Sequence, residues 1–167
     1  MFGADRADRP PPRRDRVIHD GDRLTLGDKT VVLYVTPGHT PGTLSALIPV
    51  TLRGEAHVLS LLGGTAFPRT LEPTDTMGGL RAFSRSVERL SKLSQKAGAD
   101  GIINTHIFVD GSLERLAAAQ ARKVGEGTPF VIGRQAVVRY YAMFDECLKA
   151  AAERPLVPVD FSKFTHP

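Results

Sequence analysis

The chain has 167 residues, enough for one domain with its own hydrophobic core. Its 41% hydrophobic and 24% charged residues are ordinary for a water-soluble globular protein. No apolar run approaches the ~20 residues of a membrane helix, and the first residues lack the apolar core of a secretory signal. The sequence as written therefore predicts a cytoplasmic protein with no membrane partner. A periplasmic or secreted location stays open if an upstream segment carries a signal.

Residues 1–16 form a basic, proline-rich leader, and the whole chain carries a formal net charge of +4. A contact with nucleic acid or acidic lipid is one interpretation of such a segment. No aromatic residue lies between its arginines for base stacking, and aspartates dilute the charge. These features favour a disordered leader and no nucleic-acid partner. The arginines are Arg6, Arg9, Arg13, Arg14 and Arg16.

Residues 17–62 have the pattern of antiparallel strands. An Asp20-Gly21 turn and the alternating Leu24 and Leu26 predict two short strands that join a strand over 29–36. Further strands are predicted over 44–50 and 56–62, separated by a polar segment. The last of these ends in Gly63-Gly64-Thr65, a backbone that another group can approach closely.

The most informative stretch is residues 36–42, which read Thr-Pro-Gly-His-Thr-Pro-Gly. An apolar strand stops at one Pro-Gly pair, presents His39 and stops again at the second pair. Because proline fixes φ and glycine permits unusual conformations, the backbone orients the imidazole. A zinc ligand needs a neutral imidazole in a fixed orientation, which this loop would supply. A turn histidine that hydrogen-bonds to its own loop is the alternative.

The second half of the domain, which we place at residues 17–154, alternates helices with one short strand. A long helix is predicted after the N-cap oxygens of residues 74–76 and ends at Gly98. A buried strand over 101–105 follows, and His106 stands at its carboxyl end. Two more helices are predicted, from residue 113 to about 124 and up to residue 154, with 155–167 as an extended tail. The apolar stripes are Leu80, Phe83, Val87, Leu90 and Ala97 in the first helix, and Val137, Tyr141, Phe144 and Leu148 in the third.

Cys147 is the only cysteine, so no internal disulfide forms and the redox compartment is unconstrained. Its place within a helical pattern predicts a small buried apolar residue. His19, beside the first turn, is expected to be exposed. His57, near the start of its strand, is expected to be structural or exposed.

These features, in this order, resemble the second half of a metallo-β-lactamase-fold hydrolase across residues 17–150. The matching features are the Asp-Gly-Asp turn, the motif around His39, the strand ending in Gly63-Gly64, and Asn104-Thr105-His106 followed by Asp110-Gly111. The resemblance implies an α/β (α+β) fold: half of a four-layer αβ/βα sandwich, with one mixed sheet and about three helices. It also implies two zinc ions, with His39 as a ligand of the first and His106 as a ligand of the second.

The sequence also departs from that family. The His-x-His-x-Asp-His cluster of the family's first half is absent, and Gly64 or Thr65 stands where many relatives have a bridging Asp. The nearest relatives would be the histidine-rich subclass without that Asp. A catalytic zinc needs about three protein ligands, whereas the resemblance supplies one to each ion, and Asp110 is not counted as a replacement. No catalytic residue is assigned, and the chain alone is expected to be inactive.

The expected function is therefore a partial zinc hydrolase. The complete protein would take a small-molecule substrate and hydrolyse a β-lactam, a lactone or another ester- or amide-like bond. Thr65 and Phe67 either line the substrate pocket or belong to an ordinary connector. The alternative is a non-catalytic interaction module that keeps the scaffold without metal. A sheet with helices on one side exposes its other face, so self-association is expected.

Overall fold

The computed structural model describes residues 15–66, 73–106, 109–123 and 125–153, with the side chains of the first long helix described from residue 79. The predicted leader lies outside this range except for Asp15 and Arg16. The predicted tail 155–167 and Phe67 lie outside it entirely. Among the described residues, no helix is both long and apolar enough to cross a membrane.

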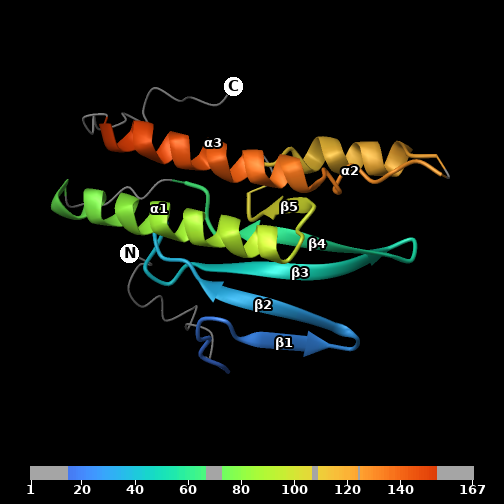
Figure 1. Ribbon diagram of the computed structural model, residues 1–167, viewed down its shortest axis with the longest axis horizontal. Coiled ribbons are helices and arrows are strands. Elements are labelled where there is room, and N and C mark those ends of the chain that lie inside the picture. The colour runs from blue at the N-terminus through green and yellow to red at the C-terminus, as the bar shows by residue number, and fades with distance from the viewer. Residues whose placement is uncertain (1–14, 67–72, 107–108, 124, 154–167) are drawn as a thin grey trace, which may run out of the picture.

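One five-stranded mixed sheet and three helices make up the described chain, as the sequence predicts (Figure 1). The strands lie in the sheet in chain order, β1-β2-β3-β4-β5, and the first four are antiparallel neighbours. β5 runs parallel to β4, which requires the crossover that the first helix provides. The strands are β1 (Arg23–Leu26), β2 (Lys29–Val35), β3 (Leu44–Leu52), β4 (Glu55–Leu62) and β5 (Gly101–Asn104); the helices are α1 (Pro73–Lys96), α2 (Ser112–Ala121) and α3 (Arg134–Glu153).

The prediction of two short strands before β2 is wrong, because only β1 forms there. The stretch before β1 is instead a turn fastened by the Asp20 carboxylate, which accepts a hydrogen bond of 2.9 Å from the Val35 amide. Arg89 of α1 donates to both oxygens of Asp20, at 2.9 and 2.6 Å. The Arg89 hydrogen bond holds the pKa of Asp20 below its ordinary value. This side-chain bond takes the Val35 amide, and residues 15–19 carry no regular structure.

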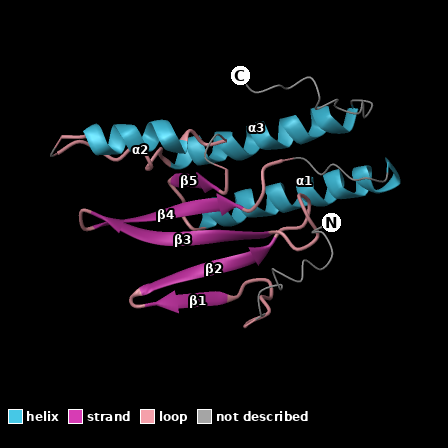
Figure 2. Ribbon diagram, turned by 180° about the vertical axis from the view of Figure 1, so that it is seen from behind, coloured by secondary structure: helices cyan, strands magenta, loops and turns pink. Residues whose placement is uncertain are grey.

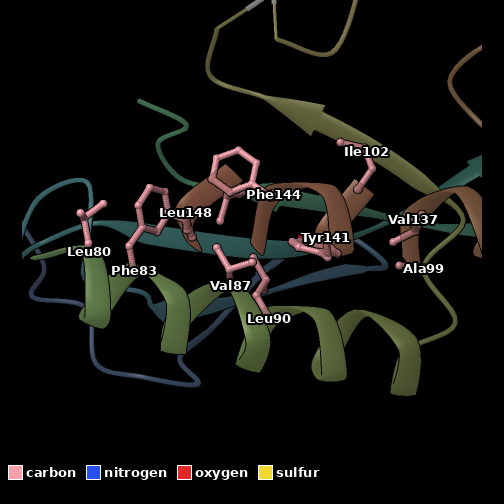
Figure 3. Packing of buried hydrophobic residues seen from close by; sticks show 11 residues of the cluster. Leu80, Phe83, Val87, Leu90, Ala99, Ile102, Val137, Tyr141, Phe144 and Leu148 are labelled. Carbon is pink, nitrogen blue, oxygen red and sulfur yellow. The ribbon is translucent and has the colours of Figure 1, made fainter. Parts of the chain in front are cut away.

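The core lies between the sheet and the two long helices (Figure 3). Phe83 of α1 and Phe144 of α3 meet edge to face, with ring centroids 5.5 Å apart. The predicted stripe of α1 is buried as far as Leu90, but Ala97 is exposed because the helix ends at Lys96. Cys147 is also exposed, which corrects the prediction of a buried thiol. It follows Phe144 and precedes Leu148 on α3 but lies off the stripe that those residues form.

A chain of hydroxyl groups crosses this core. The hydroxyl groups of Tyr141 and Ser60 share a hydrogen bond of 2.6 Å, and those of Ser60 and Ser94 share one of 2.8 Å. Ser94 then donates to the Leu90 carbonyl at 2.7 Å. Burial raises the pKa of Tyr141 to about 12. The chain fastens β4, α1 and α3 to one another through groups that would otherwise be buried without partners.

The opposite face of the sheet carries no helix of the described residues (Figure 2), and the strand register makes it aliphatic. Strand pairing sets Leu33 beside Ala46, Ala46 beside Leu61, and Leu61 beside Ile103. These side chains point away from the helices, because successive residues of a strand alternate between faces and Ser60 points toward Tyr141. We call this surface the bare face. Its members, all half-buried except for the buried Ala46, are Val31, Leu33, Val35, Leu44, Ala46, Ile48, Val50, Leu59, Leu61 and Ile103.

Candidate metal centre

The sheet brings both predicted zinc-ligand histidines to one of its edges. Val35, the last residue of β2, pairs with Leu44, and Leu62, the last of β4, pairs with Asn104, the last of β5. The carboxyl ends of these three strands therefore lie at the same edge. His39 lies in the loop that follows β2, and His106 lies two residues after the end of β5. Both loops therefore begin at this edge, and the segment after β4 lies between them.

Buried polar contacts hold the base of the His39 loop. The Thr36 amide donates to the Thr43 carbonyl at 2.9 Å, which closes the loop across its base. The hydroxyl groups of Thr36 and Ser45 lie 2.7 Å apart, and Ser45 Oγ also accepts from the Gly63 amide at 3.1 Å. These contacts tie the loop to the end of β4.

Helix α1 supports the same loop from the core side. Ser86 donates a hydrogen bond of 2.7 Å to the Pro37 carbonyl. Gly38 is buried at φ +153, and a Cβ there would lie 2.4 Å from Cβ of Phe83 and 2.5 Å from its Cα. Only glycine lets the loop approach the helix so closely. The two Pro-Gly pairs therefore frame a loop that is packed against α1.

The His39 imidazole is held by the segment that follows β4 and not by its own loop. Its Nδ1 lies 2.8 Å from the carbonyl oxygen of Ala66, 27 residues further along the chain. Gly64 lies against the ring: a Cβ at that position would be 2.7 Å from Cδ2 of His39. The alternative of a turn histidine bonded within its own loop is therefore not what the structure has.

The loop that presents His106 is organised by Asp110, whose residue is 8% exposed. One carboxylate oxygen accepts from the Asn104 amide at 3.0 Å, and the other accepts from the Ser112 amide at 2.9 Å and from its hydroxyl group. His106 itself is exposed, and its carbonyl accepts from the Val109 amide at 3.1 Å. Because its oxygens serve this loop, Asp110 is a structural residue and does not replace a missing ligand.

Two buried polar atoms at this edge lack a hydrogen-bond partner within the described part of the chain: the Thr65 hydroxyl oxygen and the amide nitrogen Nδ2 of Asn104. Thr65 lies between the glycine that touches His39 and the carbonyl that binds it. Asn104 lies two residues before His106, and its Oδ1 accepts from the Tyr140 hydroxyl at 3.2 Å. Buried polar atoms are normally paired, so among the described residues the unpaired buried side-chain atoms lie at this edge.

The donors at this edge fit zinc by type but not by number. Imidazole nitrogen is an ordinary zinc ligand, and a zinc site in a protein takes three or four protein ligands. In residues 15–66, 73–106, 109–123 and 125–153, no three His, Cys, Asp or Glu side chains come together in a way that could hold a metal ion. The described residues therefore do not complete a zinc site, and no metal-dependent step follows from them alone.

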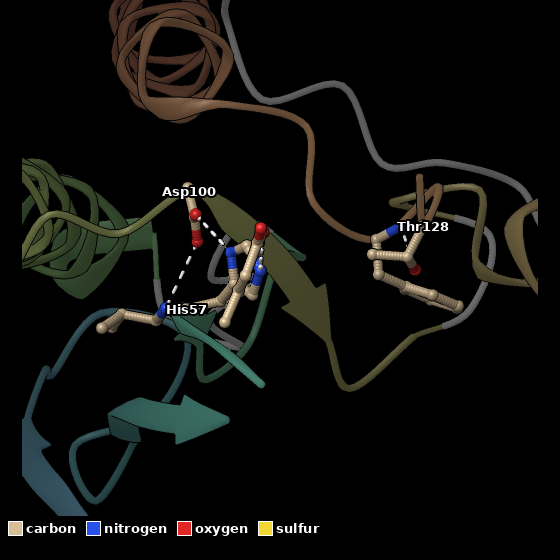
Figure 4. Close-up of polar contacts among 6 residues, drawn as sticks. His57, Asp100 and Thr128 are labelled. Atoms are coloured by element: carbon tan, nitrogen blue, oxygen red, sulfur yellow. Dashed lines mark hydrogen bonds and ion pairs between the residues drawn. The ribbon is translucent and has the colours of Figure 1, made fainter. Parts of the chain in front are cut away.

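His57 lies at the other end of β4, and its environment is structural. Its Nδ1 lies 2.7 Å from Asp100, whose other oxygen accepts from the Val58 amide at 3.2 Å (Figure 4). The side chain is 14% exposed, so of the two alternatives that the sequence leaves open, the structural one holds. A cavity of about 320 Å³ opens beside it, between the β3–β4 turn and the segment that joins α2 to α3. This cavity is separate from the edge with His39 and His106.

Solved metallo-β-lactamases share this architecture. BJP-1, a subclass B3 enzyme of Bradyrhizobium japonicum, superposes with a TM-score of 0.66 at 23% identity, over 85% of this chain and 52% of that chain. FEZ-1 from Legionella gormanii gives a TM-score of 0.68 at 19% identity, over 82% and 50%. The Rm3 metallo-β-lactamase gives 0.65 at 25% identity, over 84% and 51%. The chain has the metallo-β-lactamase fold. It spans about half the length of these structures.

Two curated proteins are similar in sequence. The uncharacterized protein ML0493 of Mycobacterium leprae is 39% identical over 90 residues, which are 53% of this chain and 39% of that protein. The acyl-coenzyme A thioesterase MBLAC2 of Gallus gallus is 24% identical over 118 residues, 70% of this chain and 40% of that protein. No family model matches the chain. The metallo-β-lactamase-fold chain thus spans about two fifths of each of these relatives.

The sequence located this edge but missed part of what builds it. The Pro-Gly pairs and the strand ends predict where His39 and His106 lie, and Thr65 lies in the segment that holds the His39 ring. The Ala66 carbonyl was missed, because a backbone group leaves no signal in sequence. The sequence predicts a close approach at Gly63-Gly64, but not that the approaching group is the His39 imidazole. Phe67, the other expected pocket residue, lies outside the described residues.

Proposed function

We propose that this chain is one part of a metallo-β-lactamase-fold zinc hydrolase. His39 and His106 would each bind one of two zinc ions, and the remaining ligands would come from polypeptide other than these 167 residues. The observation that carries the proposal is the placement of both imidazoles in loops at one sheet edge. Water activated by bound zinc is the nucleophile that such a centre supplies.

The chain alone would be inactive. Each ion would receive one imidazole from this chain, and one ligand does not hold a catalytic zinc in place. The absence of any three-ligand group among the described residues supports this part of the proposal.

The substrate class is a small molecule with an acyl bond. The similar structures are β-lactamases, which act on an amide bond, and one relative is named as an acyl-coenzyme A thioesterase. A β-lactam, a lactone or another ester- or amide-like bond, thioesters included, presents the same electrophilic carbonyl carbon. The choice among these would depend on loops around the edge and on the rest of the protein.

A non-catalytic interaction module is the second candidate. It is favoured by the bare face, which offers an aliphatic surface, and by the incomplete ligand set. Such a module would keep the fold and bind a partner without metal. Zinc binding distinguishes the two candidates.

The first measurement is the zinc content of the purified full chain after dialysis, together with its hydrolysis of a β-lactam, a lactone and an acyl-coenzyme A thioester. The expected result is less than stoichiometric zinc and no hydrolysis. Tight, stoichiometric zinc in the chain alone would contradict the ligand count. The genomic DNA upstream of the Met1 codon is then read for an in-frame His-x-His-x-Asp-His sequence.

If that cluster is encoded, the assembled protein is tested with His39→Ala and His106→Ala. Each variant is expected to lower bound zinc by about one ion and hydrolysis by at least 10²-fold, on the order expected for a lost ligand. His19→Ala is the matched control, because the His19 side chain is 81% exposed beside the first turn. Unchanged hydrolysis in His39→Ala would refute its role, and the lack of both cluster and zinc would favour the interaction module.

A further inference from the structure

We propose that Gly64 and the carbonyl of Ala66 form a seat that fixes both the position and the proton of the His39 imidazole. In this seat Nδ1 carries the hydrogen and Nε2 keeps a free lone pair. The inference deepens the proposed function, since it states which nitrogen His39 offers to a ligand. It is nevertheless a property of the metal-free chain and can be measured there.

The hydrogen bond determines the tautomer. A carbonyl oxygen only accepts, so Nδ1, at 2.8 Å from the Ala66 oxygen, is the donor. A neutral imidazole has one N–H, which leaves Nε2 unprotonated. A hydrogen bond of this kind changes the ratio of the two tautomers by about tenfold. Within the described residues, this is the imidazole's one hydrogen bond.

Because Gly64 has no side chain, the His39 ring can lie against its backbone. Gly64 is buried at φ +112, and a Cβ there would lie 2.7 Å from Cδ2 and 2.8 Å from both Cγ and Cβ of His39. The His39 Cβ is fixed by the backbone, so a change of rotamer alone would not remove the overlap. The loop itself would have to move, against its contacts with Ser45 and Ser86.

An imidazole held in this way is prepared for coordination. Histidines that bind metals commonly donate their second ring N–H to a carbonyl or carboxylate, which fixes the tautomer and the ring orientation. The Nε2 lone pair of His39 can then bind a Lewis acid without first losing a proton. Gly64 is thus a positioning residue that acts through His39.

The experiment observes the imidazoles of the metal-free full chain directly. Long-range ¹H–¹⁵N correlation spectra are recorded at a pH about two units above the ordinary imidazole pKa, with signals assigned through His39→Gln. We expect His39 in the Nδ1–H form in the unmodified chain. In Gly64→Ala the population of the His39 Nε2–H tautomer is expected to rise by about fivefold or more. The loss of the hydrogen bond to Ala66 removes most of a tenfold preference for the Nδ1–H tautomer.

The chain contains its own reference and two matched controls. The Nδ1 of His57 binds Asp100 at the far end of β4, so its Nδ1–H signature is expected to persist in Gly64→Ala. Gly42→Ala alters the His39 loop where a Cβ would meet nothing within 4 Å. Gly54→Ala introduces a side chain at φ +86, also in open space, and so tests backbone strain without contact. Both controls are expected to leave the ratio of the two His39 tautomers unchanged.

Several results would overturn the inference. His39 in the Nε2–H form in the unmodified chain would do so, as would a His39 spectrum unaffected by Gly64→Ala. Loss of the His57 signature in the same variant would show that Gly64 supports the whole fold and not the imidazole in particular. Because none of these measurements uses zinc or substrate, the seat can stand where the proposed hydrolase fails, and the reverse.

Discussion

At the residue scale, Asp110 illustrates how one carboxylate shapes the loop that presents His106. It accepts the amides of Asn104 and Ser112 and the Ser112 hydroxyl, so it joins the end of β5 to the start of α2. Gly111, at φ +66, lies between Asp110 and Ser112 and turns the chain into α2. The His106 backbone therefore belongs to a closed loop and not to a free connector.

Replacement of this carboxylate should loosen the loop. Asp110→Asn places an amide N–H₂ against one of the two backbone donors, so at least one buried hydrogen bond is lost. We expect the free energy of unfolding to fall by about 1–3 kcal/mol, measured by urea denaturation. Asp28→Asn is the control, because the Asp28 side chain is 83% exposed and its ion pair with Lys29 lies at the surface. Equal stability of Asp110→Asn and the unmodified chain would contradict the structural role.

What the sequence could predict differs from residue to residue. The positions of His39 and His106 are predictable, because proline and glycine pairs mark a loop and a short apolar strand precedes His106, whereas their roles as zinc ligands stay predictions. The Asp110-Gly111-Ser112 sequence predicts a helix cap, and Asp110 does accept the Ser112 amide at the start of α2, whereas its hydrogen bond to the Asn104 amide leaves no signal in the sequence. Cys147 was misplaced because position 147 is adjacent in sequence to the buried Leu148 but not on its helical face. Contacts between distant backbone groups, such as that of Ala66, have no counterpart in a residue pattern.

At the element scale, strand and helix boundaries followed the pattern closely where apolar periodicity was long, as in α1, β3 and β4. The error before β2 has a physical cause: the Asp20 side chain takes the Val35 amide. The elements are then joined by the hydroxyl chain from Tyr141 through Ser60 to Ser94, which no periodicity indicates. These serines stand at positions where an apolar stripe would have a hydrophobic residue.

The burial of Tyr141 predicts a specific pH dependence of stability, because burial raises the pKa of its phenol. Its pKa is raised from 10.0 to about 12 in the folded chain, so the unfolded chain releases this proton first as pH rises. The contribution of the neutral phenol to stability is thus fully present below pH 10.0 and is lost between there and about pH 12.

The order of stability of Tyr141→Phe and the unmodified chain should therefore reverse as pH rises. Near neutral pH the variant should be less stable by about 1–2 kcal/mol, because Ser60 loses a partner. Across the alkaline range the unmodified chain should lose about 2–3 kcal/mol relative to the variant, so the order reverses. Urea denaturation of both proteins at several alkaline pH values measures the difference. A constant difference would show that the phenol ionises alike in both states.

At the scale of the whole molecule, the unusual feature is the bare face. Helices α1 and α3 cover one side of the sheet, whereas the aliphatic residues of the other side have no described element over them (Figure 2). An aliphatic sheet face is ordinarily packed against a second layer about 10 Å away. The chain also spans only about half of the solved metallo-β-lactamases that share its fold. On these two observations we propose that a further layer packs on this face.

The isolated chain is therefore expected to associate with itself. Sedimentation velocity over a range of concentrations should show species larger than one chain, because association removes the aliphatic face from water. The double variant Leu33→Lys and Leu61→Lys places two charges on the bare face and should return the chain to a monomer. Met143→Lys, at a position 55% exposed on α3, should leave association unchanged.

The open edge of β1 is the other surface through which chains could pair, and it is tested separately. Thr25→Lys alters an exposed residue of that edge strand whose side chain, beside Thr30, lies on the face opposite the bare face. If this variant alone restored the monomer, association would run through strand pairing and the bare face would not be the cause. A monodisperse, stable monomer of the unmodified chain would mean that the aliphatic face tolerates water. The view of this chain as one layer of a larger sandwich would then lose its physical basis.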